Sequence, residues 1–237
     1  MKFFTYPSQH LTFYESIMTE HAGRSRVLPA GLYGITAEKF SAGRTNIQVV
    51  EEMVKGGIKI IQYREKRTSK SYRTILEECR QIRTLTRAAG VTFIVNDYVD
   101  IALLVDADGV HVGQDDLPVG EVRKLLGSDK IVGLSTHSPA QAEEAVLAGA
   151  DYIGVGPIFA TQTKDDVCDA VGFDYLDWVV KNISLPFVAI GGIKLHNIDQ
   201  IVQRGAKTIC LVTEIVAAPD IVARVHDLNT AFAGITT

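Results

Sequence analysis

Short apolar runs alternate with amphipathic segments from Gly31 to the end of the chain. The apolar runs are typical of β-strands and lie at residues 31–36, 58–65, 91–97, 109–116, 130–138, 152–159, 185–192 and 206–215. Each is followed by apolar residues at helical spacing, at residues 46–55, 69–89, 99–106, 119–127, 139–150, 175–182, 197–205 and 219–232. Strands covered on both faces by crossover helices carry such nearly continuous apolar stretches. The pattern therefore predicts eight β-α units.

Eight such units predict an α/β fold, and the count favours a (β/α)8 TIM barrel over the alternative of an open doubly wound sheet. Residues 1–30 lack clear periodicity and are expected to form a short N-terminal extension. Residues 31–237 are expected to form a single barrel domain that carries the catalytic site. Ser69 is the predicted N-cap of the second long helix, and Gly90 is expected to end it.

Composition supports a soluble, cytoplasmic protein. Hydrophobic residues make up 46% and charged residues 22% of the chain, and its apolar runs are too short to cross a bilayer. The N-terminus lacks the apolar core of an export signal. Cys79, Cys168 and Cys210 are too widely spaced to indicate a disulfide framework or a metal site. A net charge of -4 argues against a general nucleic-acid binder, and the sequence leaves a homo-oligomer open.

Polar residues concentrate where the predicted strands end, which is the face on which barrels build their active sites. The second predicted strand ends in Gln62, Arg64, Glu65 and Lys66, the third in Asn96 and Asp97, and the fourth in His111, Gln114, Asp115 and Asp116. The later strands add Ser135, Thr136, His137, Thr161, Thr163, Lys164, Gly191, Gly192, Val212 and Thr213.

Two of these groups suit a pyrophosphate. Thr161, Thr163 and Lys164 offer two hydroxyls and an ammonium within four residues. Gln62, Arg64 and Lys66 occupy alternate positions, so they point the same way along a strand. The alternatives are a solvated surface turn for the first group and a salt-bridge layer at the barrel mouth for the second.

Asp97 and Asp116 end neighbouring strands, so their carboxylates are expected to lie close together. At about 4 Å and an effective dielectric near 20, two like charges repel by roughly 4 kcal/mol, and a counter-ion would relieve that repulsion. Mg²⁺ suits one or two carboxylates completed by water and substrate phosphate oxygens. The alternative is that each aspartate caps a helix N-terminus.

A second anion site is expected after the seventh and eighth strands, where barrels often bind a monophosphate. Gly191 and Gly192 expose backbone N–H groups there, and Val212 and Thr213 follow the next strand. No hydrolytic triad is indicated, and His111 and His137 are interpreted as structural.

Six motifs, in the order QYREK, NDYVDIALLVDADGVHVGQDDLP, GLSTH, YIGVGPIFATQTK, AIGGI and LVTEI, resemble those of the thiamine-phosphate synthase family. The resemblance runs from about Gly31 to Ile215. It implies a transferase that joins hydroxymethylpyrimidine diphosphate to thiazole phosphate, giving thiamine phosphate and pyrophosphate. The diphosphate departs with help from Mg²⁺, and the thiazole nitrogen attacks the pyrimidine methylene.

The resemblance also implies roles for the residues above. Asp97 and Asp116 would bind Mg²⁺, and Arg64, Lys66, Ser135 and Lys164 would be catalytic. The pyrimidine diphosphate would be held by Gln62, Arg64, Lys66, Asn96, Ser135 and Lys164. The thiazole phosphate would be held by Thr161, Thr163, Gly192, Val212 and Thr213.

Three features depart from the family pattern. Tyr98 stands where the family commonly has Arg, Thr213 stands where it commonly has Ser, and the N-terminal extension has no counterpart. Of these, Tyr98 is the one expected to alter substrate affinity or loop position. The alternatives to a synthase are the related thiazole tautomerase, which uses a histidine where His137 stands, and a non-catalytic binder of thiamine precursors.

Overall fold

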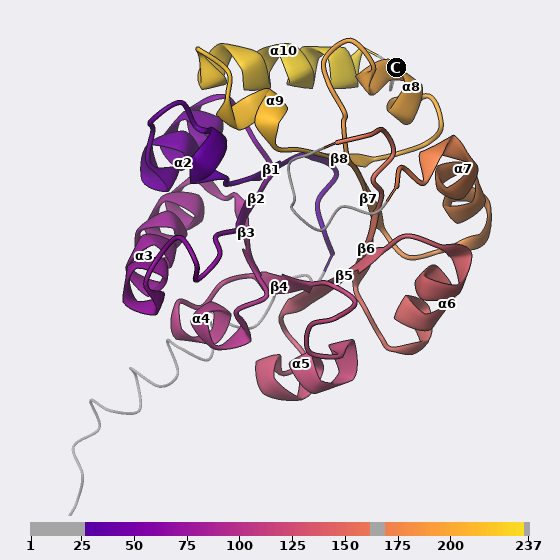
Figure 1. The fold of residues 1–237 in the computed structure, drawn as a ribbon, viewed down its shortest axis with the longest axis horizontal. Helices are drawn as coiled ribbons and strands as arrows, with labels where there is room; N and C mark the ends of the chain where they lie inside the picture. The colour runs from indigo at the N-terminus through magenta and orange to yellow at the C-terminus, as the bar shows by residue number, and fades with distance from the viewer. Residues whose placement is uncertain (1–26, 162–168, 235–237) are drawn as a thin grey trace, which may run out of the picture.

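The computed structural model describes residues 27–161 and 169–234, and within them eight parallel strands close into a barrel surrounded by helices (Figure 1). Each strand pairs with the next along the chain, and β8 pairs with β1. The predicted (β/α)8 barrel is thus confirmed, and the open doubly wound sheet is excluded because the sheet has no edges.

The strands are β1 (Gly31–Ile35), β2 (Ile60–Tyr63), β3 (Thr92–Asn96), β4 (Gly109–Val112), β5 (Ile131–Thr136), β6 (Tyr152–Val155), β7 (Phe187–Ile190) and β8 (Thr208–Leu211). The helices are η1 (Glu38–Phe40), α2 (Asn46–Lys55), α3 (Tyr72–Ala89), α4 (Val99–Leu104), α5 (Val119–Leu126), α6 (Pro139–Leu147), α7 (Gly172–Asn182), α8 (Ile198–Val202), α9 (Thr213–Val216) and α10 (Ile221–Ala233).

Several strands are shorter than the apolar pattern predicts. The predicted strand over residues 206–215 is wrong at its end, because β8 stops at Leu211 and α9 starts at Thr213. Val212, between them, has φ -111° and ψ -88°, which is not an extended conformation. Apolar residues past the barrel wall belong to helices that pack against it, so hydrophobicity alone extends the strands too far.

Helix ends follow local hydrogen-bonding signals. Thr45 and Gln48 form a capping box at the start of α2. The predicted N-cap of α3 is wrong: Ser71 accepts the N–H of Thr74 at 3.1 Å, whereas Ser69 donates to the carbonyl of Lys66 at 2.7 Å within the preceding turn. The predicted end of α3 is confirmed, because Gly90 adopts the left-handed conformation with φ 66°.

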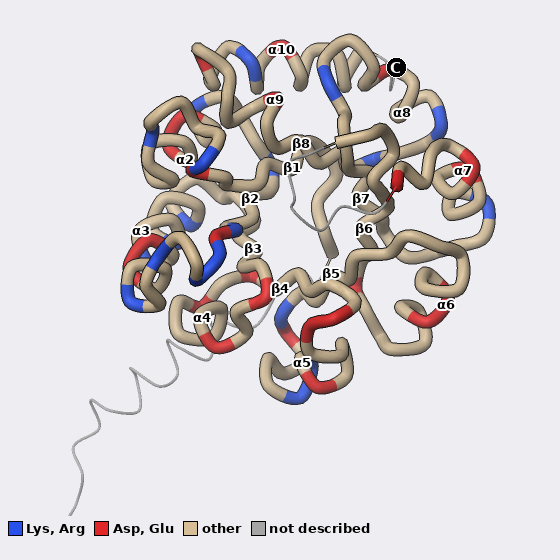
Figure 2. Tube along the Cα trace, in the orientation of Figure 1, with Lys and Arg blue, Asp and Glu red and all other residues tan. Residues whose placement is uncertain are grey.

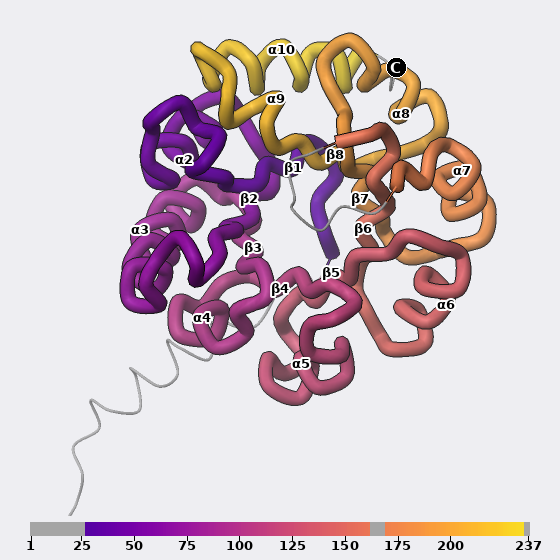
Figure 3. The backbone as a smooth tube through the Cα atoms, viewed as in Figure 1, coloured from indigo at the N-terminus to yellow at the C-terminus, as the bar shows by residue number. Residues whose placement is uncertain are grey.

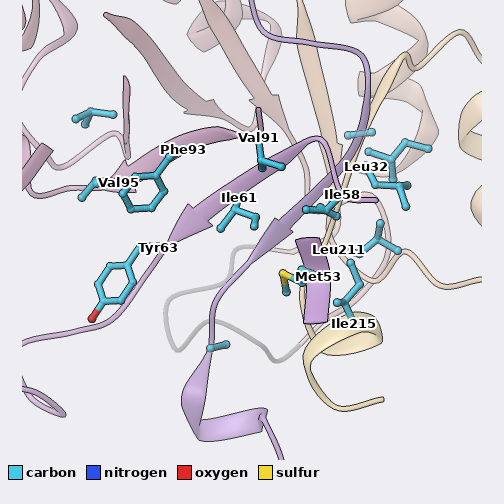
Figure 4. Close-up of a cluster of buried hydrophobic side chains, with 14 of the residues drawn as sticks. Leu32, Met53, Ile58, Ile61, Tyr63, Val91, Phe93, Val95, Leu211 and Ile215 are labelled. Atoms are coloured by element: carbon cyan, nitrogen blue, oxygen red, sulfur yellow. The ribbon is translucent and has the colours of Figure 1, made fainter. Parts of the chain in front are cut away.

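The larger part of the core lies between the barrel wall and the helices. Figure 4 shows Leu32, Ile61 and Phe93 of the strands facing the same layer as Met53 of α2 and Ile215 of α9. All five side chains are fully buried. Removing a large side chain of this kind from water contributes about 1.5–3 kcal/mol, so this layer supplies much of the driving force for closing the barrel.

A second cluster fills the inside of the barrel and makes it a packed core. Its members are Leu28, Tyr33, Ile35, Ile60, Ile94, Ile131, Tyr152, Val188 and Cys210. Gly133 makes room for one of them, because a Cβ at that position would lie 2.1 Å from Cζ of Tyr152. The two tyrosines bring phenol groups into an otherwise apolar interior, directly beneath the end of the barrel where polar residues gather.

The two ends of the described chain meet on one side of the barrel. Strand β1 lies beside β8, and α10 lies beside α2 (Figure 3). Before β1, Leu28 is buried among the interior residues, and Thr208 donates to the carbonyl of Pro29 at 3.3 Å. The division into an extension of residues 1–30 and a barrel of residues 31–237 stays a prediction. In residues 27–161 and 169–234, no helix is both long enough and apolar enough to span a membrane.

Candidate active site

Strand register brings the polar residues of β2 to β6 to one end of the barrel. Asn96 of β3 pairs with His111 of β4, and Ser135 of β5 pairs with Gly154 of β6. Because the strands are parallel, their carboxyl ends share one rim, and inward-facing residues near these ends form its floor. Gly154 lies against this floor, where a Cβ would be in van der Waals contact with Cε1 of His111 at 3.4 Å.

A chain of hydrogen bonds crosses the inside of the barrel below this rim. Gln62 Nε2 donates to Tyr33 Oη at 2.7 Å, and the hydroxyls of Tyr33 and Tyr152 are 3.1 Å apart. Tyr152 Oη lies 2.9 Å from His111 Nδ1. His111 Nε2 in turn lies 2.9 Å from Ser135 Oγ. The chain therefore links two residues predicted to bind substrate, Gln62 and Ser135, which stand on opposite sides of the floor.

The two phenols in this chain keep their protons. Burial raises the pKa of Tyr33 well above its ordinary value, and burial likewise raises the pKa of Tyr152. With Gln62 as donor to Tyr33, each phenol can donate onward toward His111 Nδ1. In a neutral imidazole that accepts at Nδ1, the proton is on Nε2 and donates to Ser135 Oγ, which leaves the serine hydroxyl proton available to a ligand.

The loop between β2 and α3, residues 64–71, carries the predicted cations. Figure 2 shows Lys and Arg gathered on this connection, with acidic residues on the connections that follow β3 and β4. Arg64 is half-buried, and its backbone N–H donates to Thr36 Oγ1 at 2.9 Å, whereas Lys66 is exposed. Strand β2 ends at Tyr63, so the alternation argument covers Gln62 and does not extend to Lys66.

Between the two cations, Glu65 turns away from the barrel mouth. Its Oε1 accepts the N–H of Glu38 and the side-chain N–H of Asn46, both at 3.0 Å. A salt-bridge layer does exist nearby, in which Lys70 contacts Glu38 and Glu78. These ion pairs join the loop to η1 and to α3.

Asp97 and Asp116 lie on neighbouring connections at the rim. Asp97 follows β3 with a left-handed φ of 62°, and its N–H donates to the carbonyl of His111 at 2.9 Å. Asp116 Oδ2 accepts the N–H of Gly113 at 2.7 Å, within the turn after β4. The helix-capping alternative is wrong for both, because the N-cap residues of α4 and α5 are Tyr98 and Pro118.

The connection after β6 lies against the glycines after β7. Phe159 N–H donates to the carbonyl of Gly191 at 3.0 Å. Gly192 has φ 64°, and a Cβ there would lie 2.7 Å from Cβ of Phe159, so only glycine fits. Thr161, in the first part of this connection, is half-buried. Thr163 and Lys164 lie outside the described residues.

The ends of β7 and β8 add a cation that the sequence reasoning missed. Val212 and Thr213 begin the connection after β8, and Lys194 Nζ donates to Thr213 Oγ1 at 3.3 Å. Lys194 also pairs with Glu214 at 3.3 Å. Lys194 stands two residues after Gly192, and this position could have identified it from the sequence. A positive charge therefore stands beside the predicted monophosphate site.

Both histidines make hydrogen bonds within the protein, and their interpretation as structural stays a prediction. His137 Nδ1 lies 2.6 Å from the carbonyl oxygen of Gly156. His111 belongs to the interior chain of hydrogen bonds and so lies closer to the candidate site than its interpretation as structural alone implied. The sequence analysis also missed Tyr33 and Tyr152 as residues of the site. Both alternate with other strand residues that face the barrel interior, and both carry a polar hydroxyl, so these two features could have identified them.

Comparisons with known proteins assign the chain to a family. Residues 32–215 match the family described as Thiamine monophosphate synthase. The chain belongs to the thiamine monophosphate synthase family. Similarity extends beyond that range: a curated thiamine-phosphate synthase from Pelotomaculum thermopropionicum is 64% identical over 212 residues, covering 90% of this chain and 96% of the relative. Another from Lawsonia intracellularis is 56% identical over 204 residues, covering 86% and 93%.

Solved structures give the same result for the fold. The thiamine phosphate pyrophosphorylase from Pyrococcus furiosus superposes with a TM-score of 0.80 at 31% identity, covering 90% of this chain and 99% of that one. A 3-hexulose-6-phosphate synthase superposes with a TM-score of 0.61 at 16% identity, covering 84% and 98%, and shares the fold alone. The expected family, and with it an enzyme of the transferase class, is confirmed.

Proposed function

We propose that this chain is a thiamine-phosphate synthase that condenses hydroxymethylpyrimidine diphosphate with thiazole phosphate to give thiamine phosphate and pyrophosphate. The sequence similarity along residues 32–215 carries this proposal, because the barrel alone is shared with enzymes that act on other substrates. In the reaction, the bond between the pyrimidine methylene carbon and a diphosphate oxygen breaks. The thiazole nitrogen then forms a bond to that carbon, so the nucleophile comes from the substrate.

The pyrimidine diphosphate lies, in this proposal, over the floor formed by the ends of β2 to β5. Gln62 and Asn96 would bind the ring, and the cations would face the leaving diphosphate. Neutralising the charge that grows on the diphosphate is the largest contribution the protein can make to such a reaction. The proposed residues are Gln62, Arg64, Lys66, Asn96, Ser135 and Lys164, of which Arg64, Lys66, Ser135 and Lys164 act in catalysis.

The thiazole phosphate lies on the opposite side of the mouth, where the connections after β6, β7 and β8 meet. Backbone N–H groups and hydroxyls would bind the phosphate and aim the thiazole nitrogen at the pyrimidine methylene. Holding two substrates in line is itself a large part of the acceleration. The proposed residues are Thr161, Thr163, Gly192, Val212 and Thr213.

Asp97 and Asp116 fit a hard divalent cation, and Mg²⁺ is the proposed cofactor. Both carboxylates are exposed at adjacent strand ends, each on a turn fixed by backbone hydrogen bonds. No group of three or more His, Cys, Asp or Glu in residues 27–161 and 169–234 is arranged as a protein-only metal cage. Mg²⁺ needs no such cage, since it accepts one or two carboxylates together with water and phosphate oxygens. Once bound, it would help to neutralise the diphosphate.

The proposed synthase activity also leads to proposals for the partners and the location of the protein. The partners proposed are small phosphorylated substrates and, where copies associate, a homo-oligomer, without nucleic acid or membrane. The proposed location is the cytoplasm. The thiazole tautomerase is not favoured, because it would leave the two carboxylates and the cations after β2 without a role. A non-catalytic binder of thiamine precursors is separated from the synthase by turnover.

The deciding experiment is pyrophosphate release by the purified full-length protein with both phosphorylated precursors and Mg²⁺. Release that requires both precursors and the metal, with an equal amount of thiamine phosphate, supports the synthase. Controls omit one precursor or add a chelator. Tight binding of the precursors without release would support the non-catalytic binder, and conversion of the thiazole compound alone would support the tautomerase.

A further inference from the structure

Tyr98 connects two loops that carry different parts of the proposed diphosphate site. Its Oη donates to the backbone carbonyl of Glu65 at 3.1 Å. Glu65 stands between Arg64 and Lys66 in the β2–α3 loop, whereas Tyr98 directly follows Asp97. This hydrogen bond therefore joins the loop that carries the proposed phosphate-binding cations to the turn that carries a proposed metal ligand.

The ring of Tyr98 reinforces this connection. It packs edge-to-face against Tyr72, with ring centroids 5.7 Å apart and an interplanar angle of 77°. Arg67 lies over the other ring of the pair, with its Cζ 5.1 Å from the centroid of Tyr72. The hydroxyl thus contacts the loop itself, and the ring contacts Tyr72 at the start of α3, directly after the loop.

The turn that carries Tyr98 is itself rigid. Asp97 N–H donates to the carbonyl of His111 at 2.9 Å, and Tyr98 N–H donates to the carbonyl of Asn96 at 2.7 Å. Val99 N–H donates to the carbonyl of Asp97 at 3.0 Å. With Asp97 at a φ of 62°, few other backbone arrangements are open to this turn. Tyr98 is therefore a fixed point from which the β2–α3 loop can be positioned.

The far side of the β2–α3 loop is also anchored. The Glu65 carboxylate accepts from Glu38 and Asn46, and the Lys66 carbonyl accepts from the backbone N–H groups of Ser69 and Lys70 at 3.0 and 3.2 Å. These bonds tie the loop to its own turn and to the outer helices. The Tyr98 bond ties the loop toward the β3 end.

We propose that Tyr98 is a positioning residue that holds the β2–α3 loop at the correct distance from Asn96 and Asp97 and thereby sets the affinity for the diphosphate substrate. This inference rests on the proposed function, since it takes the diphosphate to lie between that loop and the β3 turn. Tyr98 acts through Arg64 and Lys66 and does not touch the reacting atoms. The thiazole phosphate site, across the mouth, is independent of it.

Steady-state kinetics of Tyr98→Phe test the proposal, because this variant removes the hydroxyl and keeps the ring. The KM for the pyrimidine diphosphate is expected to rise about threefold to tenfold, as for the loss of one hydrogen bond. The KM for the thiazole phosphate is expected to stay unchanged. Tyr72→Phe is the matched control: it removes the hydroxyl that donates to Asp100 but keeps the same ring pair, and it should leave both KM values unchanged.

A wild-type KM in Tyr98→Phe, or an equal rise for both substrates, would overturn the proposal. Thermal unfolding of each variant separates a positioning role from a structural one. Tyr98→Ala extends the series: a larger rise in the same KM supports positioning, and a lower melting temperature with an unchanged KM contradicts it.

The proposal can fail independently of the synthase activity. Should the wild-type protein show no turnover, the proposed function fails, and calorimetric binding of inorganic pyrophosphate with Mg²⁺ takes the place of kinetics. Weaker binding by Tyr98→Phe than by Tyr72→Phe would still support the positioning role. Equal binding by the two variants, or no binding by the wild type, would overturn it.

Discussion

The hydroxyls of Tyr33 and Tyr152 lie 3.1 Å apart inside the barrel, although 119 residues separate them in the chain. Their rings are tilted by 54° with centroids 6.5 Å apart. Through this contact the Gln62 amide on one wall is connected to His111 and Ser135 on the other. The orientation of the polar groups on the floor of the candidate site is therefore set by two phenols that stand below it.

Replacing Tyr152 by Phe should lower kcat/KM for thiamine phosphate formation by about tenfold, which is about 1.4 kcal/mol of transition-state stabilisation. The variant keeps the ring but frees His111 Nδ1 from its partner, so the imidazole no longer holds Ser135 in one orientation. Steady-state kinetics with both precursors measure the change. Tyr175→Phe is the control, because it loses a 2.7 Å bond to Thr136 outside the barrel interior. Comparable losses in both variants would contradict the proposed role of the chain of hydrogen bonds.

Gly133→Ala should destabilise the protein by about 1–3 kcal/mol and reduce activity, because its new Cβ would lie 2.1 Å from Cζ of Tyr152. The ring must move, and its hydroxyl moves with it. Urea unfolding monitored by circular dichroism measures the stability. Gly120→Ala in α5 has open space around the new Cβ and should be neutral or slightly stabilising. An unchanged urea midpoint in Gly133→Ala would contradict this prediction, because it would mean that the barrel interior accommodates the displaced Tyr152 ring at no cost in stability.

Lys66→Ala and Asp97→Ala should each lower turnover at least about tenfold, since one removes a cation from the leaving diphosphate and the other a ligand of the proposed Mg²⁺. Asp97→Ala should also raise the Mg²⁺ concentration needed for half-maximal rate. Lys124→Ala, on the exposed side of α5, is a charge-matched control for Lys66→Ala. Rates near that of the wild type in both site variants would refute these assignments.

The protein should lose stability progressively above about pH 10, where an ordinary tyrosine ionises. Burial raises the pKa of Tyr33 and Tyr152, and burial followed by the hydrogen bond to Glu78 raises the pKa of Tyr63. Each buried phenol stabilises the folded state as long as it is protonated. Because its pKa is raised in the folded state, this contribution to the free energy of unfolding is complete below the pKa of the unfolded state and is lost as the pH rises through the pKa of the folded state. Urea unfolding at a series of alkaline pH values measures the slope. Tyr152→Phe should make the slope shallower, and an unchanged slope would count against this origin.

The sequence pattern alone determined the fold and the family of this protein. The alternation of apolar runs with helical spacing predicted the eight-unit barrel, because each unit buries its own faces against its neighbours. The order of the motifs predicted the family and placed Gln62, Asn96 and Ser135 at the strand ends. What local pattern could not fix was the length of each element: Ser71, and not Ser69, caps α3, because the choice depends on the turn that leaves the barrel rim.

Closure of the barrel decided the rest. The contacts of Tyr33 with Tyr152, of His111 with Ser135 and of Tyr98 with Glu65 join different β-α units. Their distances depend on strand register and on the tilt that closing the sheet imposes. A sequence pattern states which face a residue occupies but not which residue stands opposite it. The sequence alone therefore named most of the candidate residues. The tertiary structure added Tyr33, Tyr152 and Lys194 and decided how all of them are arranged into a connected site.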